Sequence, residues 1–247
     1  MIQVFETIFL LFFIGLIIVF IVLEKRGQST FFRDLPAFRR LKRALGLAVE
    51  EGKRIHIALG GGSLVSENFA SGLIGLSVLE RLARVAAVGD RPPVASSGEG
   101  GMMLLSQDTL KSASRRLGLG AEMLASQGRM TGTTPFSYAI SVQPLMREES
   151  VSVDLLLGSM GSEAGLMCDA SERQGNLRIG GSEDLSAQAV YYAATTDPLL
   201  GEELFAAGAY LECGTAHRAS LRAQDVMRWV LIVVLLVGVL AKGIGLL

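Results

Sequence analysis

Cysteine and histidine are scarce in this chain. Its 247 residues include two cysteines, Cys168 and Cys213, and two histidines, His56 and His217. The cysteines form no CxxC pair and neither histidine stands at a ligand-like spacing from them, so neither a disulfide framework nor a zinc site is expected. We accordingly predict two small buried thiols, no metal and no cofactor.

The familiar catalytic and nucleotide-binding motifs are also missing. The segments GSMGS (158–162) and SSGEG (96–100) differ from the GxSxG nucleophile turn, and no HExxH sequence occurs. The glycine run GGGS (60–63) matches neither the GxGxxG fingerprint nor the P-loop pattern. The sequence therefore assigns no catalytic residue, which favours a non-catalytic role and leaves enzymatic activity open.

Charge is nearly absent from both ends of the chain. Residues 7–23 carry none, and residues 229–247 carry only Lys242. At ~1.5 Å rise per residue, a helix of either length crosses a ~30 Å hydrocarbon core. The first run lacks the basic flank and the small-residue cleavage site of a signal peptide. We therefore predict transmembrane helices at 1–24 and 229–247.

The charges that are present divide the remainder of the chain. Residues 25–54 contain nine basic and three acidic residues, whereas residues 55–228 contain thirteen basic and nineteen acidic ones. Basic residues flanking a span stay in the cytoplasm. The segment between the two spans should therefore be cytoplasmic, with both termini outside.

The basic segment 25–54 is predicted to be a juxtamembrane linker helix lying along the lipid headgroups. Asp34 could cap its start, and apolar residues recur at helical spacing from Leu35 to Val49. No aromatic platform accompanies the basic run, so we expect anionic lipid and no nucleic acid as its partner. The residues expected to face lipid are Arg39, Arg40, Lys42 and Arg43.

Short β-like runs alternate with helical patterns through residues 55–215. Strands are expected at 55–59, 93–96, 121–126, 151–157, 176–181 and 189–195. Strands separated by helices predict the α/β class, a mostly parallel open sheet with helices on both faces. The domain plan is thus a cytoplasmic α/β domain at 55–215 and a linker at 216–228, with one transmembrane helix at each end.

Three motifs resemble an uncharacterised family of bacterial membrane proteins, which is catalogued only as a domain of unknown function. They are IALGGGSL (57–64), LLLGSMGSEAGLM (155–167) and GEELFAAGAYL (201–211). The resemblance covers residues 32–225 and implies a membrane-attached α/β body, located at the bacterial inner membrane. It supplies no established activity and no catalytic residues.

Glycine, serine and glutamate follow several of the expected strands. In an open α/β sheet the carboxyl ends of strands converge on one crevice, and an acidic, hydroxyl-rich crevice suits a cation or an amine. Ordinary capping of helix starts is the alternative explanation. The candidate ligand-binding residues are Gly60, Gly61, Gly62, Ser63, Glu99, Ser159, Gly161 and Glu163.

The helical pattern over 69–89 is apolar over most of its circumference. Gly72 and Gly75 there, and Gly208 further on, permit close approach, so we predict them as contacts between protomers. Packing inside the domain's own core is the alternative. The predicted function is a membrane-anchored homo-oligomeric scaffold. Its expected partners are further copies of itself and anionic lipid, and other membrane proteins are left open as further partners. The second hypothesis is a ligand-binding or enzymatic domain that uses the strand-end crevice.

Overall fold

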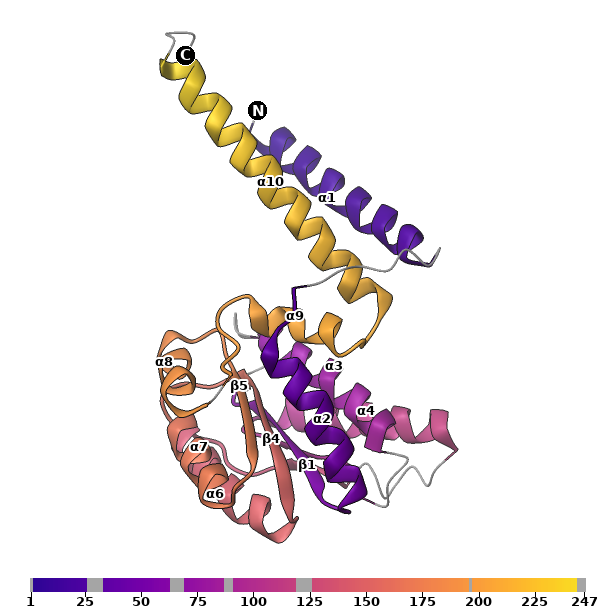
Figure 1. Cartoon of the computed structure of the whole chain (residues 1–247), viewed down its shortest axis with the longest axis vertical. Coiled ribbons are helices and arrows are strands. Elements are labelled where there is room, and N and C mark those ends of the chain that lie inside the picture. Colours follow the sequence, from indigo (N-terminus) through magenta and orange to yellow (C-terminus); the bar gives the residue numbers. More distant parts are fainter. Residues whose placement is uncertain are drawn as a thin grey trace. The chain divides into compact units, whose positions relative to one another are not determined.

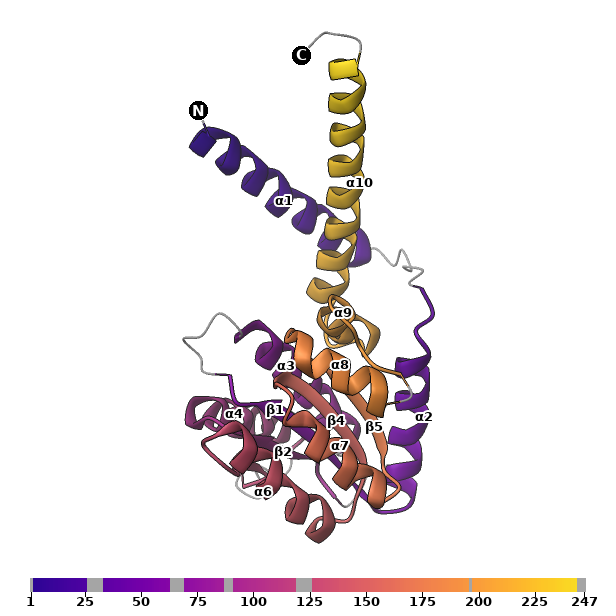
Figure 2. The ribbon, with the colours of Figure 1, turned by 90° about the vertical axis from the view of Figure 1, so that its left-hand side faces the viewer.

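The computed structural model describes residues 2–25, 33–62, 69–86, 91–118, 126–195 and 197–243. The chain divides into two compact units. One comprises the segments Met1–Phe32 and Gly214–Leu247, and the other is Arg33–Cys213 (Figures 1 and 2). Each unit is described by itself below.

The second unit is built on a five-stranded sheet in the order β3-β2-β1-β4-β5. Every neighbouring pair is parallel, which confirms the predicted parallel open sheet. The strands are β1 (Arg54–Gly60), β2 (Val94–Ser97), β3 (Gly128–Met130), β4 (Val151–Ser159) and β5 (Leu177–Gly181).

Helices cover both faces of this sheet (Figure 1). Successive residues of a strand point to opposite faces, so Ile55, Ile57 and Leu59 of β1 join one apolar core while Ala58 joins the other. The first core includes residues of α2 (Pro36–Glu50), α3 (Phe69–Ala86), α4 (Gly100–Leu117) and α9 (Glu203–Tyr210). The second includes residues of α6 (Pro135–Glu148), α7 (Ala164–Arg173) and α8 (Leu185–Ala194).

One strand prediction differs from the structure, and another lies almost wholly outside the described residues. Residues 189–194 belong to α8 and not to a last strand, because Asp184 caps this helix by accepting from the N–H groups of Ser186 and Ala187. The predicted third strand, 121–126, lies outside the described residues except for Ser126, and the described third strand is β3.

α2 packs against the sheet and so differs from the predicted helix along the headgroups. Its apolar residues Phe38, Leu41 and Leu45 are buried in the first core, and α2 contacts β1, β4 and β5. The N-cap residue is Leu35, followed by proline at the first helical turn. Asp34 does not cap the helix but forms an ion pair with Arg39 over 2.7 Å.

The first unit consists of two long helices that pack against each other, α1 (Ile2–Lys25) and α10 (Thr215–Gly243). The stretches Glu6–Lys25 and Thr215–Leu240 are long and apolar enough to cross a membrane. α10 is continuous, so the predicted linker 216–228 is helical. Glu24, near the end of α1, pairs with Arg218, near the start of α10, over 2.6 Å.

Candidate functional site

The order in which successive strands are added to the sheet reverses between β1 and β4. β2 and β3 lie on one side of β1, whereas β4 and β5 lie on the other. In open α/β sheets, ligands commonly bind beyond the carboxyl ends of the strands at such a switch point. The predicted crevice residues that the structure describes belong to this edge of the sheet.

The glycine turn after β1 is bonded to the turns after both neighbouring strands. Gly61 donates its N–H to the carbonyl of Ser159 over 2.9 Å, and Gly98 donates its N–H to the carbonyl of Gly60 over 2.9 Å. Gly60 has φ +77° and lies so close to the backbone of Ser159 that a Cβ would collide with it. The geometry of the sheet edge alone therefore requires glycine at position 60.

The two predicted carboxylates form local hydrogen bonds. Glu99 is the N-cap residue of α4, where its side chain accepts from the N–H of Met102 over 2.8 Å. Glu163 is buried and accepts from the N–H of Gly161 over 2.8 Å. Helix capping thus explains Glu99, whereas Glu163 closes the turn after β4 without capping α7.

The structure brings most of the predicted crevice residues to one edge. Glu99 follows the neighbouring strand β2, and Ser63 lies outside the described residues. Within the described ranges, no three His, Cys, Asp or Glu side chains are grouped so that they could hold a metal ion. The predicted residues at the ends of β1 and β4 and in the turns that follow them are Gly60, Gly61, Gly62, Ser159, Gly161 and Glu163.

A buried polar network that the sequence analysis missed crosses three adjacent strands. His56 of β1 lies between Ser96 of β2 and Asp154 of β4. Its Nε2 is 2.8 Å from the Ser96 hydroxyl, and its Nδ1 is 3.0 Å from the Asp154 carboxylate. These three residues have exposures of 0–1%. We call them, with the three partners described next, the His56 network.

The outer members of the His56 network come from α6, α7 and the start of β5. Tyr138 donates its hydroxyl to the Ser96 carbonyl over 3.2 Å, and burial raises the pKa of this hydroxyl, which keeps it a donor. Asp154 accepts from the Ser171 hydroxyl over 2.5 Å and from the Asn176 amide over 2.8 Å. His56 then donates from Nδ1 to the carboxylate and accepts at Nε2 from Ser96.

The His56 network has the atoms and spacing of a Ser-His-Asp triad but not its access to solvent. A nucleophilic serine must reach a substrate carbonyl, whereas Ser96 is 1% exposed and Tyr138 covers it. With its donors and acceptors paired, the network joins three strands to two helices. A sequence signal existed: His56 and Asp154 interrupt apolar strands, and a buried parallel strand tolerates such residues only when they are paired.

The outer surfaces of the two helical layers differ in charge. α6 exposes Phe136 (59%) and Ile140 (57%), and α8 exposes Leu185 (81%) and Tyr192 (73%). α8 has no charged residue, α6 has none before Arg147, and the charges of α7 lie in its C-terminal half. The opposite layer displays Arg39, Arg40, Lys42, Arg43, Glu80, Arg84, Lys111, Arg115 and Arg116. We define the α6–α8 face by Phe136, Ile140, Leu166, Leu185 and Tyr192.

The glycines predicted as protomer contacts are buried inside the α/β domain. A Cβ on Gly72 would collide with the side chain of Met102 in α4, and one on Gly75 would lie 2.7 Å from the carbonyl of Leu157. Gly208 is buried as well. α3 packs against α4, α9, β1 and β4, so most of its apolar circumference is covered by the same chain, and Leu73 is 42% exposed. These glycines therefore serve internal packing.

The basic residues predicted to face lipid are not equivalent. Arg39 pairs with Asp34, and Lys42 lies 3.4 Å from Glu212. Arg40 pairs with Asp197 over 3.0 Å, and Arg43 is exposed. All four remain on the outer side of α2.

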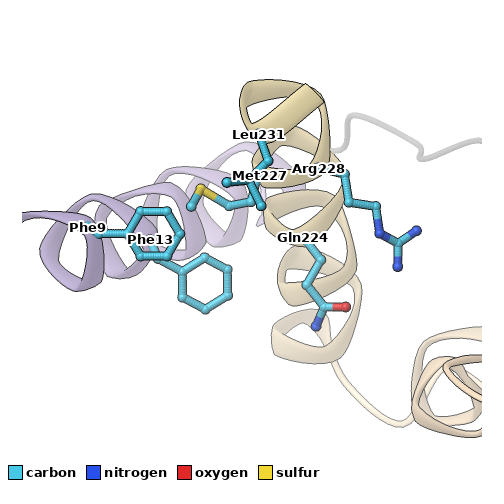
Figure 3. A pocket seen from close by; sticks show the side chains of 6 residues that line it. All are labelled: Phe9, Phe13, Gln224, Met227, Arg228 and Leu231. Atoms are coloured by element: carbon cyan, nitrogen blue, oxygen red, sulfur yellow. The ribbon is translucent and has the colours of Figure 1, made fainter. Parts of the chain in front are cut away.

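The helix pair of the first unit contains a groove of about 300 Å³ (Figure 3). Aromatic side chains of α1 face Met227 and Leu231 of α10, with two polar residues of α10 beside them. The lining residues are Phe9, Phe13, Gln224, Met227, Arg228 and Leu231.

A doubly wound α/β domain that carries two membrane-length helices defines the class of this protein. Residues 1–247 match the family described as a domain of unknown function (DUF6754), and the chain belongs to that family. No curated protein and no solved structure matches the chain. The expected resemblance to a domain of unknown function is thus confirmed, and the function has to be argued from the geometry.

Proposed function

We propose that the protein is a membrane-anchored scaffold that forms a homo-oligomer through the α6–α8 face. The carrying observation is that this face exposes four large apolar side chains by 57–81%, and Leu166 by 37%, on helices with few charges. The large apolar side chains exposed on the opposite layer lie among many charged ones. Clustered apolar side chains on a soluble surface are typical of interaction sites. The interface thus lies on α6–α8 and not at the glycines of α3.

A second copy is the partner that fits this face best. A surface with few charges meets its own copy with little like-charge repulsion, and a two-fold arrangement presents the same patch from both sides. Two membrane-length helices hold all copies in one plane, which raises their effective concentration. Weak apolar contacts then suffice for assembly.

The proposal places α1 and α10 across the bacterial inner membrane, with the α/β domain in the cytoplasm and both termini outside. Its support is the excess of basic residues in 25–54. Alkaline phosphatase fused after residue 247 should be active, and a fluorescent protein fused there should be dark. The reverse pattern would overturn the orientation.

The molar mass of the detergent-solubilised full chain tests self-association. Light scattering should give a uniform closed oligomer for the unaltered chain. Leu185→Glu places a charge on the α6–α8 face and should shift the mass to that of a monomer. Leu104→Glu is the matched control, because Leu104 is 61% exposed on α4, on the opposite layer. It should leave the oligomer intact.

Two outcomes would contradict the scaffold proposal. If the unaltered chain is a monomer at all protein concentrations, the proposal of self-association is wrong. If Leu104→Glu and Leu185→Glu dissociate the oligomer equally, the α6–α8 face is not its interface. Circular dichroism of both variants verifies that the α/β domain remains folded.

Ligand binding at the carboxyl edge is the second candidate function. The observation that favours it is the strand order, because the bonded turns after β1 and β4 meet at the switch point. Glu163 would supply the charge for a cation or an amine. This function needs no contact between copies.

Native mass spectrometry of the solubilised chain separates the two candidate functions. If the edge binds a ligand, Glu163→Gln should remove a bound small molecule, whereas Glu172→Gln, at the exposed C-terminal end of α7, should retain it. If the scaffold proposal alone is right, neither variant changes the bound mass or the oligomer.

A further inference from the structure

A cavity of about 270 Å³ lies where the chain enters and leaves the α/β domain. Most of its lining comes from the first turns of α2, and one wall comes from the last residue of α9. Its lining residues are Asp34, Leu35, Phe38, Arg39, Lys42 and Tyr210. We call it the Arg39 pocket.

The apolar wall of the Arg39 pocket is rigid. The rings of Phe38 and Tyr210 are stacked, with centroids 4.8 Å apart and an interplanar angle of 8°. The Tyr210 hydroxyl donates to the carbonyl of Arg33 over 2.7 Å. Because Phe38 is also buried in the first core, the wall holds α2 and α9 in one arrangement.

Two basic side chains line the Arg39 pocket and remain available to an anion. Arg39 pairs with Asp34, and both side chains are more than 60% exposed; Lys42 and its partner Glu212 are each 55% exposed. Ion pairs as exposed as these contribute about 0–1 kcal/mol, so a stronger anion displaces the carboxylates easily. The arginine fork and the lysine ammonium together match the oxygens of a phosphate group.

We propose that the Arg39 pocket binds the phosphate group of an anionic lipid headgroup through Arg39 and Lys42. Chain connectivity supports a lipid as the source of the phosphate. Asp34 follows the end of α1 by nine residues, and Tyr210 precedes the start of α10 by five. Nine residues span at most ~30 Å. The proposal goes beyond self-association and does not depend on it.

The structure predicts that only two of the four basic residues on α2 matter for this binding. Arg40 pairs with Asp197, and neither Arg40 nor Arg43 lines the pocket. The double variant Arg39→Gln/Lys42→Gln should therefore weaken binding of phosphatidylglycerol about tenfold or more, since each basic group contributes about 1 kcal/mol. Arg40→Gln/Arg43→Gln removes the same charge and should change binding less than about twofold.

The measurement is titration of the solubilised full chain with phosphatidylglycerol and, separately, with phosphatidylcholine, followed by native mass spectrometry. Asp34→Asn gives an effect of opposite sign: it removes the competing carboxylate and should tighten binding of phosphatidylglycerol. Thermal melts by circular dichroism check that each variant is folded.

Selective loss with the Arg39/Lys42 variant and a gain with Asp34→Asn support the proposal. If both double variants lose phosphatidylglycerol binding equally, the lipid is attracted by net charge alone, and the Arg39 pocket is not the binding site. If phosphatidylcholine binds as well as phosphatidylglycerol, the proposed preference for an anionic headgroup is wrong. If glycerol 1-phosphate binds as tightly as phosphatidylglycerol, with the same dependence on Arg39 and Lys42, a free phosphate compound is the ligand and the lipid source is overturned.

Discussion

The two faces of the sheet differ in their buried polar groups and in the charge of their outer surfaces. Under α2, α3, α4 and α9 the interior is apolar, and the exterior of that layer carries many charges. Under α6, α7 and α8 the apolar interior also holds the buried His56 network, and the exterior of this layer exposes large apolar side chains with few charges. Figure 1 shows the two helical layers on either side of the sheet. Both faces therefore bury an apolar core, and the second differs by its buried polar network and by an exterior with few charges.

The difference between the faces assigns them different tasks. An apolar core under a charged surface stabilises the fold and keeps the domain soluble. A buried network with paired donors and acceptors adds directional constraints, which fix strands and helices in one arrangement. A rigid layer with an apolar exterior is what a protein interface requires. The predictions below test this comparison, starting with the largest expected effect.

Removing the imidazole of His56 should destabilise the domain far more than shortening the side chain of Ile57, which points to the other face of the sheet. His56→Phe keeps a ring but leaves the Asp154 carboxylate and the Ser96 hydroxyl short of a partner, which should lower the free energy of unfolding by about 3 kcal/mol or more. Ile57→Val, one position along β1, should cost about 1 kcal/mol. Urea unfolding in mild detergent, followed by circular dichroism, measures both changes.

A double variant separates lost hydrogen bonds from lost packing. Replacing Asp154 with leucine in the His56→Phe background removes the buried carboxylate that the first substitution left without a donor. The free energy of unfolding should then recover in part, with a coupling of about 1 kcal/mol or more. Strictly additive losses would mean that the network contributes only packing.

On the apolar face, close packing predicts a loss of stability from one added methyl group. Gly75→Ala would place Cβ 2.6 Å from Cδ2 of Leu59 and 2.7 Å from the carbonyl of Leu157, which should cost about 1–3 kcal/mol. Gly46→Ala is the control within a helix, because no atom lies within 4 Å of its added Cβ. It should stabilise α2 by about 0.5–1 kcal/mol. A neutral Gly75→Ala would mean that α3 has a free face after all.

The caps of α8 and α6 should respond differently to pH. Asp184→Ala should cost about 1 kcal/mol at neutral pH, as should Thr134→Ala. Hydrogen bonds from the Ser186 hydroxyl and the Ala187 N–H lower the pKa of Asp184, so its cap is fully stabilising above the ordinary aspartate pKa. That contribution is lost as pH falls through the lowered value.

The measured quantity is the difference in melting temperature between each cap variant and the unaltered chain. For Asp184→Ala the difference should shrink below about pH 4, the unfolded-state value for aspartate. For Thr134→Ala it should stay constant, because a hydroxyl does not titrate there. A constant difference for both would mean that the carboxylate does not act as an ionised cap.

The smallest effect concerns the thiols. Burial raises the pKa of Cys168 to about 11 and that of Cys213 to about 11, which keeps both protonated at neutral pH. Alkylation by iodoacetamide should therefore be much slower in the folded chain than in urea. Rapid modification of either residue would show that its side chain is more open than the structure indicates.

The regular elements were largely predictable from the sequence. Runs such as 151–157 and 55–59 are apolar and bounded by polar or glycine-containing turns, and both form strands of the parallel sheet. The strand prediction for residues 189–195 was wrong because tyrosine and valine favour strands, while the cap at Asp184 and the neighbouring alanines favour the helix that forms. Local composition alone does not rank these opposing preferences.

The candidate sites were less predictable, since they depend on strand order. The turns after β1 and β4 meet because these strands are neighbours, and His56 reaches Asp154, almost a hundred residues later, for the same reason. Gly72 and Gly75 looked free because the pattern of one helix does not reveal which elements cover it. α2 appeared to suit a lipid surface, yet its apolar stripe equally suits the sheet on which it packs.

Cross-linking in the membrane tests the central claim most directly. In a Cys213→Ser background, Tyr192→Cys puts a thiol on the α6–α8 face and Leu104→Cys puts one on the charged layer. A short bis-maleimide added to native membranes should give covalent dimers with Tyr192→Cys and leave Leu104→Cys monomeric. Dimers formed equally at both positions, or only at position 104, would contradict self-association through the α6–α8 face.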